Sequence, residues 1–269
     1  MKISKSKNGS ELLTFGGHLE VLRRMLFRVC GLAACVALFV FCFKEETFKL
    51  LLAPSEWDFV TYRWIERVIR YCGGGFHFEE FHVDLIATEL SSQFMTHVTT
   101  AIYLGLLGAS PYIVYELFRF VSPALYENEK KYSVQVVSVV YSLFIIGILM
   151  SYYVLFPVSF RFLGTYSVAE SVRSTITLDS YISTFVTLSL LMGVVFQLPV
   201  IAFFLAKMGI VNSRMLSTYR RHAFLAILII SAVITPPDIL TLVLVAIPLY
   251  LLYEISIWII RRVEKPKKA

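Results

Sequence analysis

Charged residues are distributed unevenly along the chain, and six long stretches contain none of them. These stretches are 29–43, 90–115, 132–160, 180–206, 222–237 and 239–253. A helix needs about 20 predominantly apolar residues to cross a bilayer. The pattern therefore predicts an all-α polytopic membrane protein with six transmembrane helices, in a single membrane domain that comprises 1–269. The predicted spans are approximately 25–43, 94–121, 132–156, 181–206, 222–235 and 239–260.

Prolines divide the predicted helices. Pro111 gives the long second span a place to bend, and Pro199 is expected to kink the fourth span. Pro157 is expected to end the third span. The fifth span has about twelve clearly apolar residues, 223–234, which make roughly 18 Å of helix. We therefore expect two short C-terminal helices.

The connection between the last two spans reads Thr235-Pro236-Pro237-Asp238. Thr is a common N-cap residue, and proline is common at the first helical position. An acidic residue at the third position can bond back to the cap. We expect Thr235 to be the N-cap of the last helix, with Pro236 at its first position and Asp238 at its third.

The longest connection, 44–89, follows the first span. Ala53-Pro54 is expected to break any helix that begins there. His77 and His82 lie near Glu79 and Glu80, but two histidines without a fuller set of ligands are weak signs of a metal site. The four cysteines show neither a disulfide framework nor metal-ligand spacing. We therefore predict no metal site.

The composition agrees with a membrane protein. The chain is 57% apolar and 16% charged, whereas a soluble domain is typically ~25% charged. These values exclude a disordered chain, a collagen, a coiled coil and an ordinary cytosolic enzyme. The sequence contains no Ser-His-Asp, HExxH, paired-carboxylate or glycine-rich phosphate-loop pattern, so we predict neither catalysis nor a cofactor.

The charges predict the orientation of the helices. With six spans and a cytoplasmic N-terminus, eighteen of the 25 basic residues fall on cytoplasmic segments, and twelve of the 19 acidic residues fall on the other side. This is the positive-inside pattern, and it places both termini in the cytoplasm. It also removes the need for a nucleic-acid partner, because basic tails beside a membrane usually reflect contact with anionic lipid.

Two polar residues interrupt the predicted spans. Gln197 places an amide in the apolar region of the fourth span, and Glu254 lies within the sixth. Polar residues inside a membrane are candidates for a functional site. A hydrogen bond between two helices is the simpler interpretation of Gln197. An ionised Glu254 is expected to face protein, water or the inner interface.

Several motifs, taken in order, resemble those of the TatC family, the multispanning core subunits of the twin-arginine protein translocase. The first two are His18-Leu19-Glu20-Val21-Leu22-Arg23, which resembles HLxELR, and Phe120 to Tyr126 with Glu129-Lys130-Lys131, which resembles FxxPxLYxxERR. The later ones are Phe156-Pro157, Phe196-Gln197-Leu198-Pro199-Val200, Met208-Gly209-Ile210-Val211, Thr235-Pro236-Pro237-Asp238, Ala246-Ile247-Pro248-Leu249 and Leu252-Tyr253-Glu254. The resemblance covers nearly the whole chain.

The resemblance implies a concave, cup-like bundle of six helices with both termini in the cytoplasm. It implies a receptor and scaffold that binds the twin-arginine signal peptides of folded cargo and assembles with single-span TatA- and TatB-like partners, with possible self-association. Export is then driven by the proton-motive force. Since no transit peptide precedes the first span, we expect the bacterial cytoplasmic (inner) membrane.

The resemblance also implies a signal-peptide site on the first cytoplasmic loop. Each guanidinium group of the ligand can pair with a carboxylate through two hydrogen bonds. The cytoplasmic face is net positive, so recognition needs a local carboxylate, and the matched residue is Glu129. Phe120 could line the groove for the apolar part of the peptide. A surface pair of Glu129 with Lys130 or Lys131 is the alternative. The remaining candidates are Glu20, Arg23, Leu125, Tyr126 and Glu127.

The chain departs from the family pattern at several positions. The glutamate of HLxELR falls on Val21 here, and either Glu20 or Glu127 could replace it. The intramembrane glutamate is Gln197, which cannot carry a charge. Glu116 adds a charge near the loop. Polar contacts with partner chains are expected at Thr235, Asp238, Thr241 and Glu254, although Leu242 weakens that expectation.

Two other function classes, a small-solute transporter and a membrane enzyme or cofactor-insertion protein, predict different patterns. A small-solute secondary transporter predicts repeated halves with paired broken helices around a midplane site, and the sequence has one proline-kinked span, at Gln197, without a counterpart. A membrane enzyme or cofactor-insertion protein predicts histidines or carboxylates that converge at one depth. Here His18 and His222 fall on the inner side, and His77, His82 and His97 on the outer side or near it.

Overall fold

The structure is a computed structural model that describes residues 15–71, 81, 83–121, 133–167, 175–235 and 238–264, and these residues are mostly helical. The helices are α1 (Phe15–Cys42), α2 (Lys44–Leu52), α3 (Val60–Tyr71), α4 (Ser92–Val121), α5 (Ser133–Met150), α6 (Phe156–Thr165), α7 (Leu178–Val195), α8 (Leu198–Lys207), α9 (Ser213–Thr218), α10 (Arg220–Ile234) and α11 (Ile239–Val263). A 3-10 turn, η1 (Ala53–Ser55), follows α2, and a π-helical turn, η4 (Ser151–Leu155), joins α5 to α6. The strands β1 (Leu85–Ile86) and β2 (Ile176–Thr177) pair in parallel.

Five helical segments in the described part of the chain are long and apolar enough to cross a membrane. They are Leu19–Cys42, Ser92–Glu116, Val137–Thr165, Leu178–Lys207 and Ile239–Arg262. The chain is therefore a multi-pass membrane protein. The fifth of the six predicted spans corresponds to α10, which is helical but has only 15 residues. The prediction of two short C-terminal helices is wrong for the last one, because α11 has 25 residues and is one of the five candidate spans.

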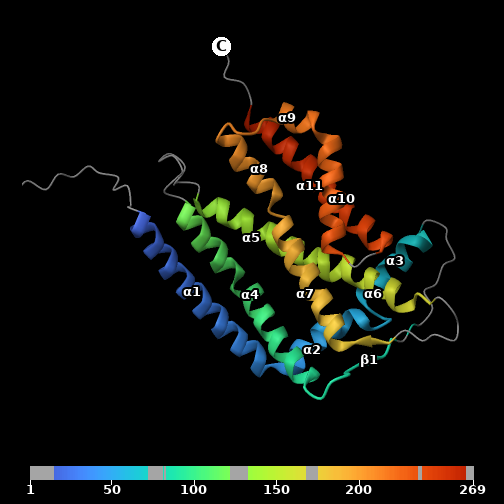
Figure 1. Cartoon of the computed structure of the whole chain (residues 1–269). Helices are drawn as coiled ribbons and strands as arrows, with labels where there is room; N and C mark the ends of the chain where they lie inside the picture. The colour runs from blue at the N-terminus through green and yellow to red at the C-terminus, as the bar shows by residue number, and fades with distance from the viewer. Residues whose placement is uncertain are drawn as a thin grey trace, which may run out of the picture.

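The long helices run back and forth between two ends (Figure 1). The end called here the α9 end carries the start of α1, the last turn of α4, α9 and the last turn of α11. The opposite end, called the α2 end, carries α2, α3 and the β1–β2 pair. At one edge of the bundle, α1 packs mainly on α4. Its apolar side chains are consequently exposed, with Leu26 at 58% and Phe27 at 73%, as expected of a helix that faces lipid.

Pro157 does not end the third predicted helix, which is a correction to the sequence analysis. The backbone remains helical from α5 through η4 and α6 to Thr165. Proline removes the amide that would bond the carbonyl four residues earlier, which here belongs to Tyr153. The Thr61 hydroxyl on α3 donates to that carbonyl instead. The Tyr62 hydroxyl donates to the carbonyl oxygen of Pro157 at 2.8 Å, and burial raises the pKa of Tyr62, which keeps it a neutral donor. Side chains of α3 thus allow the helix to continue.

Helix α2 ends at Leu52, directly before Ala53-Pro54 as expected, and side chains from distant helices bond its last carbonyls. The hydroxyl of Tyr152 donates to Leu50 at 2.7 Å, and that of Tyr181 donates to Leu51 at 2.8 Å. Carbonyls at a helix C-terminus have no partner within the helix. The two tyrosines therefore attach α2 to η4 and α7.

An aromatic cluster forms the core at the α2 end. The Phe156 ring is 2% exposed and packs edge to face against Tyr181 and Phe185, with ring centroids 4.9 and 5.1 Å apart. A second core, between α7, α10 and α11, is built around Met192, Val245 and Leu249. The positions of α3 and of these contacts could not be read from the sequence, which showed the segment 44–89 only as a long mixed loop. Its residues Cys72, His77, Glu79, Glu80 and His82 lie outside the described residues.

Helices α5 and α7 cross closely at two glycines. A Cβ atom on Gly147 would lie 2.7 Å from the carbonyl oxygen of Met192 and 3.0 Å from the Cα atom of Gly193. A Cβ atom on Gly193 would lie 2.7 Å from the ring of Phe144. Small residues that bring two backbones together are typical of helix contacts in membranes.

We expect Gly147→Ala to lower the free energy of unfolding by about 1–3 kcal/mol, because the new methyl group meets a backbone carbonyl that cannot move aside alone. The matched control is Gly31→Ala on α1, where no atom outside the local helix lies within 4 Å of the Cβ position. That variant should change stability by less than ~0.5 kcal/mol. Chemical unfolding in detergent micelles measures both, and equal stabilities would contradict the close crossing.

Candidate functional site

A close contact between α1 and α4 fixes which residues face each other toward the α9 end. A Cβ atom on Gly105 would lie 2.7 Å from Ala37 Cβ and 2.8 Å from the carbonyl oxygen of Ala33. The two helices are antiparallel neighbours (Figure 1). Residues before Ala33 on α1 therefore face residues after Gly105 on α4, and this register brings Arg28 to Glu116.

Glu116 is the most buried carboxylate of this contact. Arg28 Nη2 lies 2.9 Å from Glu116 Oε2, and the Tyr112 hydroxyl donates to Glu116 Oε1 at 2.8 Å. The side chain of Glu116 is 4% exposed, whereas that of Arg28 is 48% exposed. A buried carboxylate is costly unless it is paired and hydrogen-bonded, which is the state observed. Because Glu116 is the last residue of the candidate span Ser92–Glu116, the pair belongs to the end of that span.

Glu20, a candidate for signal-peptide recognition, lies on the exposed first part of α1. Its Oε1 atom is 2.6 Å from Arg24 Nη2, and both side chains are at least half exposed. An exposed pair of this spacing is worth only about 0.3–0.5 kcal/mol. Arg23 is exposed and forms no ion pair with the residues that the structure describes. Val21, which takes the place of the family glutamate, is also exposed.

The remaining recognition candidates belong to the segment after α4. Phe120 lies in the last turn of α4, one helical turn beyond Glu116. Leu125, Tyr126, Glu127 and Glu129 lie outside the described residues. The structure thus brings Glu20 and Glu116 to the α9 end of the α1–α4 pair, and Glu129 follows the end of α4 by eight residues in the sequence.

Gln197 lies where the fourth predicted span is interrupted. Helix α7 ends at Val195 and α8 begins at Leu198, with Pro199 in its first turn, so the expected kink is a break of one turn. The Gln197 amide donates to the carbonyl oxygens of Val140 at 3.2 Å and Gly193 at 3.3 Å. The amide therefore joins this turn to α5, which is the helix-to-helix bond considered in the sequence analysis. Its Oε1 atom is buried and has no hydrogen-bond partner within the described part of the chain.

The turn between α10 and α11 is capped differently from the prediction. Asp238, not Thr235, is the N-cap of α11, since its Oδ1 atom accepts a hydrogen bond from the Thr241 amide at 2.6 Å. Thr235 instead ends α10 by donating to the carbonyl oxygen of Ser231 at 2.9 Å. The predicted cap of the last helix was wrong because an aspartate with a free amide three residues later is at least as good a cap as threonine. Pro236 lies outside the described residues.

Asp238 Oδ2, Thr241 Oγ1 and Ser231 Oγ are buried polar atoms at this turn that have no hydrogen-bond partner among the residues that the structure describes. Buried polar atoms usually have a partner, so each exception calls for an explanation. Two of them belong to predicted partner-contact residues, Asp238 and Thr241. Glu254, the other partner-contact candidate on α11, is thirteen residues beyond Thr241, or roughly 20 Å along the helix. The structure therefore does not bring the four candidates into one site.

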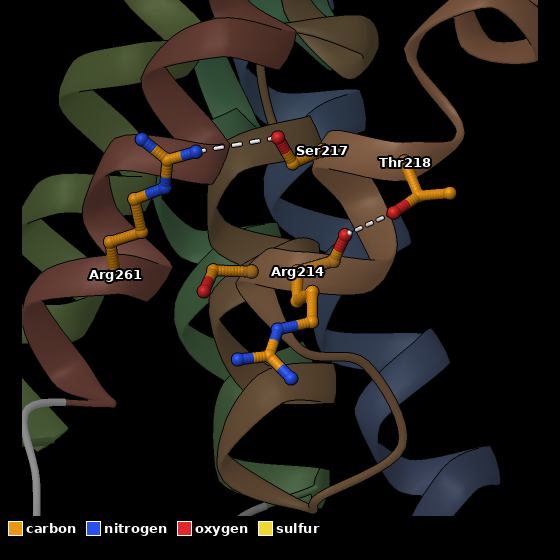
Figure 2. Close-up of a pocket in the computed structure, with 5 residues that line it drawn as sticks. Arg214, Ser217, Thr218 and Arg261 are labelled. Atoms are coloured by element: carbon orange, nitrogen blue, oxygen red, sulfur yellow. Dashed lines mark hydrogen bonds between the residues drawn. The ribbon is translucent and has the colours of Figure 1, made fainter.

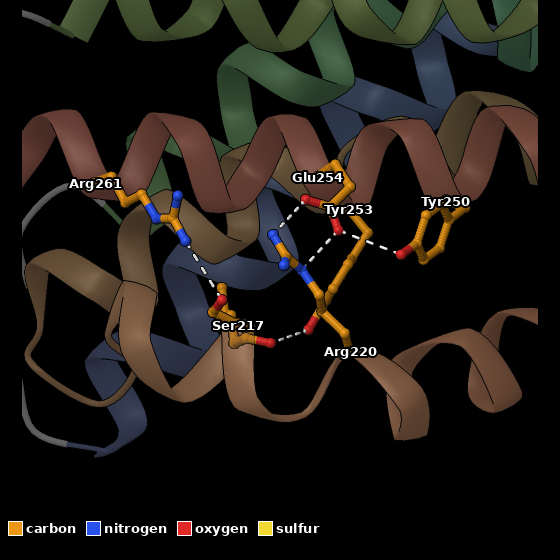
Figure 3. A network of polar contacts seen from close by, with 7 residues as sticks. Ser217, Arg220, Tyr250, Tyr253, Glu254 and Arg261 are labelled. Atoms are coloured by element: carbon orange, nitrogen blue, oxygen red, sulfur yellow. Dashed lines mark hydrogen bonds and ion pairs between the residues drawn. The ribbon is translucent and has the colours of Figure 1, made fainter.

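Glu254 joins α11 to α10 near the α9 end (Figure 3). Arg220 contacts both of its oxygens, with Nε 2.8 Å from Oε1 and Nη2 2.8 Å from Oε2, and the Tyr250 hydroxyl donates to Oε1 at 3.3 Å. Beside this pair, the Tyr253 hydroxyl donates to the carbonyl oxygen of Leu216 at 2.8 Å. Glu254 thus faces protein, as expected of an ionised carboxylate in this position.

A polar pocket of about 320 Å³ lies next to this network, between α9 and the end of α11 (Figure 2). Its lining consists of Ser213, Arg214, Ser217, Thr218 and Arg261. Arg261 donates to the Ser217 hydroxyl at 3.3 Å, and the Glu264 carboxylate accepts from the Ser213 amide at 2.9 Å. Within the described residues, no three His, Cys, Asp or Glu side chains are grouped as a metal site would require.

Sequence reasoning missed the arginine partners of Glu116 and Glu254. Arg28 is 88 residues from Glu116, and Arg220 is 34 residues from Glu254. A signal was present, because a lone charge inside an apolar stretch is costly and usually has a partner. The sequence could show that each charge needed a partner, but not which helices were neighbours.

Comparisons with known proteins identify a family. A model of the family described as "Sec-independent protein translocase protein (TatC)" matches residues 17–248. The Sec-independent protein translocase protein TatC of Blattabacterium sp. subsp. Periplaneta americana is 33% identical over 265 residues, which cover 97% of this chain and 100% of the relative. The TatC protein of Campylobacter jejuni subsp. jejuni is 32% identical over 251 residues, which cover 93% of this chain and 95% of the relative.

The fold is also similar to a solved structure. A structure described as "Crystal Structure of Twin Arginine Translocase Receptor- TatC in DDM" has a TM-score of 0.72 and 28% sequence identity. The similarity covers 90% of this chain and 99% of that chain. The sequence similarity and the fold therefore agree over nearly the whole length.

Proposed function

This chain belongs to the TatC family of Sec-independent protein translocase proteins, and on that premise we propose that it is the receptor and scaffold subunit of a twin-arginine translocase. In this role it binds the twin-arginine signal peptides of folded cargo at the cytoplasmic face. It also assembles with single-span TatA- and TatB-like proteins, and the proton-motive force drives export. The family is a transport component, so we assign no catalytic step to any residue.

The observation that carries the proposal is that carboxylates at the α9 end of α1 and α4 already bind guanidinium groups. Glu20 holds Arg24, and Glu116 holds Arg28. The α9 end carries many basic residues, so long-range attraction does not favour an arginine-rich ligand, and short-range pairing with carboxylates has to provide the recognition. Glu129 supplies a further carboxylate within the matched family motif. The other residues that we propose for this site are Phe120, Arg23, Leu125, Tyr126 and Glu127.

The α9 end is the cytoplasmic end in this proposal, because the basic residues at the start of α1, around α9 and at the end of α11 follow the positive-inside pattern. All six helices then span the bacterial cytoplasmic (inner) membrane, with both termini in the cytoplasm, and form the cup-like bundle of the family. The 15 residues of α10 make roughly 22 Å of helix, so the bilayer has to thin beside it.

Partner helices are proposed to dock at the turn between α10 and α11. Asp238 and Thr241 each present a buried polar atom there that none of the described residues hydrogen-bonds. Such atoms are costly in a membrane, and a polar side chain of a TatA- or TatB-like helix beside Thr235 would satisfy them. Gln197 offers a similar acceptor through its Oε1 atom. Glu254 is already bound to Arg220, so a partner at that position meets a paired carboxylate.

The protein in lipid nanodiscs should crosslink a photoreactive signal peptide with an Arg-Arg pair at least ~10-fold more efficiently than the same peptide with Lys-Lys. Lysine keeps the charge but loses the planar fork that matches a carboxylate, and one lost charge-assisted hydrogen bond costs about 1.5–3 kcal/mol. Equal crosslinking of the two peptides would contradict recognition of arginine. Crosslinking of neither peptide, with partner proteins present, would contradict the receptor role and raise the small-solute transporter alternative, which the family match does not favour.

A further inference from the structure

We propose that Glu116 is a second guanidinium acceptor for the signal peptide, and that Arg28 occupies this acceptor until a signal-peptide arginine displaces it. The inference rests on the proposed function, which it extends by naming an acceptor inside the described structure. One guanidinium group leaves the carboxylate as another arrives. The net charge at Glu116 is therefore the same before and after the exchange.

The surroundings of Glu116 form a built guanidinium site. The Tyr112 hydroxyl donates to Oε1 at 2.8 Å, which fixes the orientation of the carboxylate. The Oε2 atom of Glu116 lies 2.9 Å from Arg28 Nη2. With a side chain that is 4% exposed, Glu116 is shielded from water, where an ion pair is stronger than on an open surface. An empty site would leave a buried carboxylate unpaired, which is expensive. Arg28 avoids this cost because it pairs with Glu116 while no peptide is bound.

Arg28 is suited to be displaced. Its side chain is 48% exposed, although the carboxylate that it holds is almost fully covered. It donates to Glu116 through Nη2 alone, whereas an arginine and a carboxylate can form two parallel hydrogen bonds. A guanidinium group on a long stem can also turn toward the membrane surface while its stem remains on apolar surface. After displacement, the Arg28 guanidinium group can therefore lie at the membrane surface.

The position of Glu116 fits a ligand with two consecutive arginines. Successive side chains of an extended peptide point in opposite directions, so one acceptor cannot hold both guanidinium groups. Glu116 lies one helical turn before Phe120, near the end of α4, and Glu129 follows α4 by eight residues in the sequence. Glu116 can therefore take one arginine at the end of the membrane span, and Glu129 remains the proposed acceptor for the other. No carboxylate at Val21 is then required.

Replacement of Arg28 separates this exchange from a purely structural role. Arg28→Gln removes the internal competitor, so an Arg-Arg peptide should bind roughly fivefold more tightly, because a larger fraction of Glu116 is available. The thermal transition of the same variant should fall, because Glu116 loses its partner. A structural pair would instead lower stability and leave peptide affinity unchanged or weaker, and that result would overturn the proposal.

A second experiment exchanges the two charges of the Arg28–Glu116 pair. The variant Arg28→Glu with Glu116→Arg should recover the thermal stability of the wild type, because the ion pair is re-formed. It should still lose at least ~10-fold in Arg-Arg peptide affinity, since the acceptor beside Tyr112 is now an arginine. Recovery of both stability and affinity would overturn the proposal. If Arg28→Gln does not fold, Arg28→Lys replaces it, and unchanged affinity there counts against the exchange.

The wild-type protein separates failure of this inference from failure of the proposed function. If the wild-type protein crosslinks the Arg-Arg peptide in preference to the Lys-Lys peptide, the receptor role is supported. Unchanged peptide affinity in the Arg28 variants would then contradict only the proposed exchange at Glu116. Wild type that crosslinks neither peptide rejects the receptor itself. The matched control is Arg220→Gln, which breaks the ion pair with Glu254 on α11 and leaves the Arg28–Glu116 pair intact, so it should lower stability without tightening peptide binding.

Discussion

Glu129→Ala is expected to weaken crosslinking of an Arg-Arg signal peptide by roughly 30-fold or more. Removing one partner of a hydrogen-bonded charge pair at an interface costs about 2–5 kcal/mol, partly because the other charge is left unpaired. The residual crosslinking should show little preference for Arg-Arg over Lys-Lys. Photocrosslinking in nanodiscs, titrated with peptide, measures both quantities for the variant and the wild type.

Two neighbouring substitutions act as controls for Glu129. Lys130→Ala removes a cation that could pair with Glu129 on the surface, so it should leave peptide affinity unchanged or slightly higher. Glu127→Ala removes a nearby carboxylate and should have a smaller effect than Glu129→Ala. Retention of the wild-type affinity by Glu129→Ala would move the site to Glu20 or Glu127. The thermal stability of all three variants should match the wild type, since a surface ion pair contributes at most about 1 kcal/mol.

Phe156→Ala is expected to have the largest effect on stability, about 3–5 kcal/mol, because it empties a packed aromatic position. The ring is 2% exposed and contacts Tyr181 and Phe185 edge to face. Its loss leaves a cavity beside the tyrosine that bonds the end of α2. Chemical unfolding in detergent micelles, followed by circular dichroism, measures the difference from wild type.

The control for Phe156 is Phe27→Ala on the outer side of α1. Phe27 is 73% exposed and should change the free energy of unfolding by less than ~0.5 kcal/mol. Folded Phe156→Ala protein should still discriminate Arg-Arg from Lys-Lys peptides, because the aromatic cluster lies at the α2 end of the bundle, whereas Glu20 and Glu116 lie toward the α9 end (Figure 1). Similar losses of stability in the two variants would show that the cluster is not a packed core.

The sequence alone determined the class of the protein and its family. Uncharged stretches of 15 residues or more predict membrane helices whatever their neighbours are, because each helix satisfies its own backbone hydrogen bonds. The TatC motifs are local in sequence, so their order could be recognised without a structure, and the family match confirmed that identification. The break at Gln197-Leu198-Pro199 could also be anticipated, because proline acts on its own helix.

Local rules failed where two local signals competed or where a distant element intervened. Asp238 and Thr235 can both act as caps, and the observed cap is Asp238, which is the stronger N-cap residue of the two. Pro157 would end an isolated helix, but the hydroxyl of Thr61, 92 residues away from Tyr153, bonds the carbonyl that proline leaves without an amide. Helix α3 supplies that hydroxyl, and its amphipathic sequence gave no indication of what it would contact.

Only the tertiary structure decided which charges meet. Arg28 and Glu116, like Arg220 and Glu254, are charges on largely apolar helices, and the sequence required only that each find a partner. Their pairing depends on which helices are neighbours and on the register set by close contacts such as that of Gly105 with Ala33 and Ala37. A displacement of one helix by a single turn, about 5.4 Å, would move the guanidinium donor and the carboxylate acceptor of such a pair out of hydrogen-bonding distance. Pairing is therefore a property of the packed bundle, whereas the need for a pair is a property of the chain.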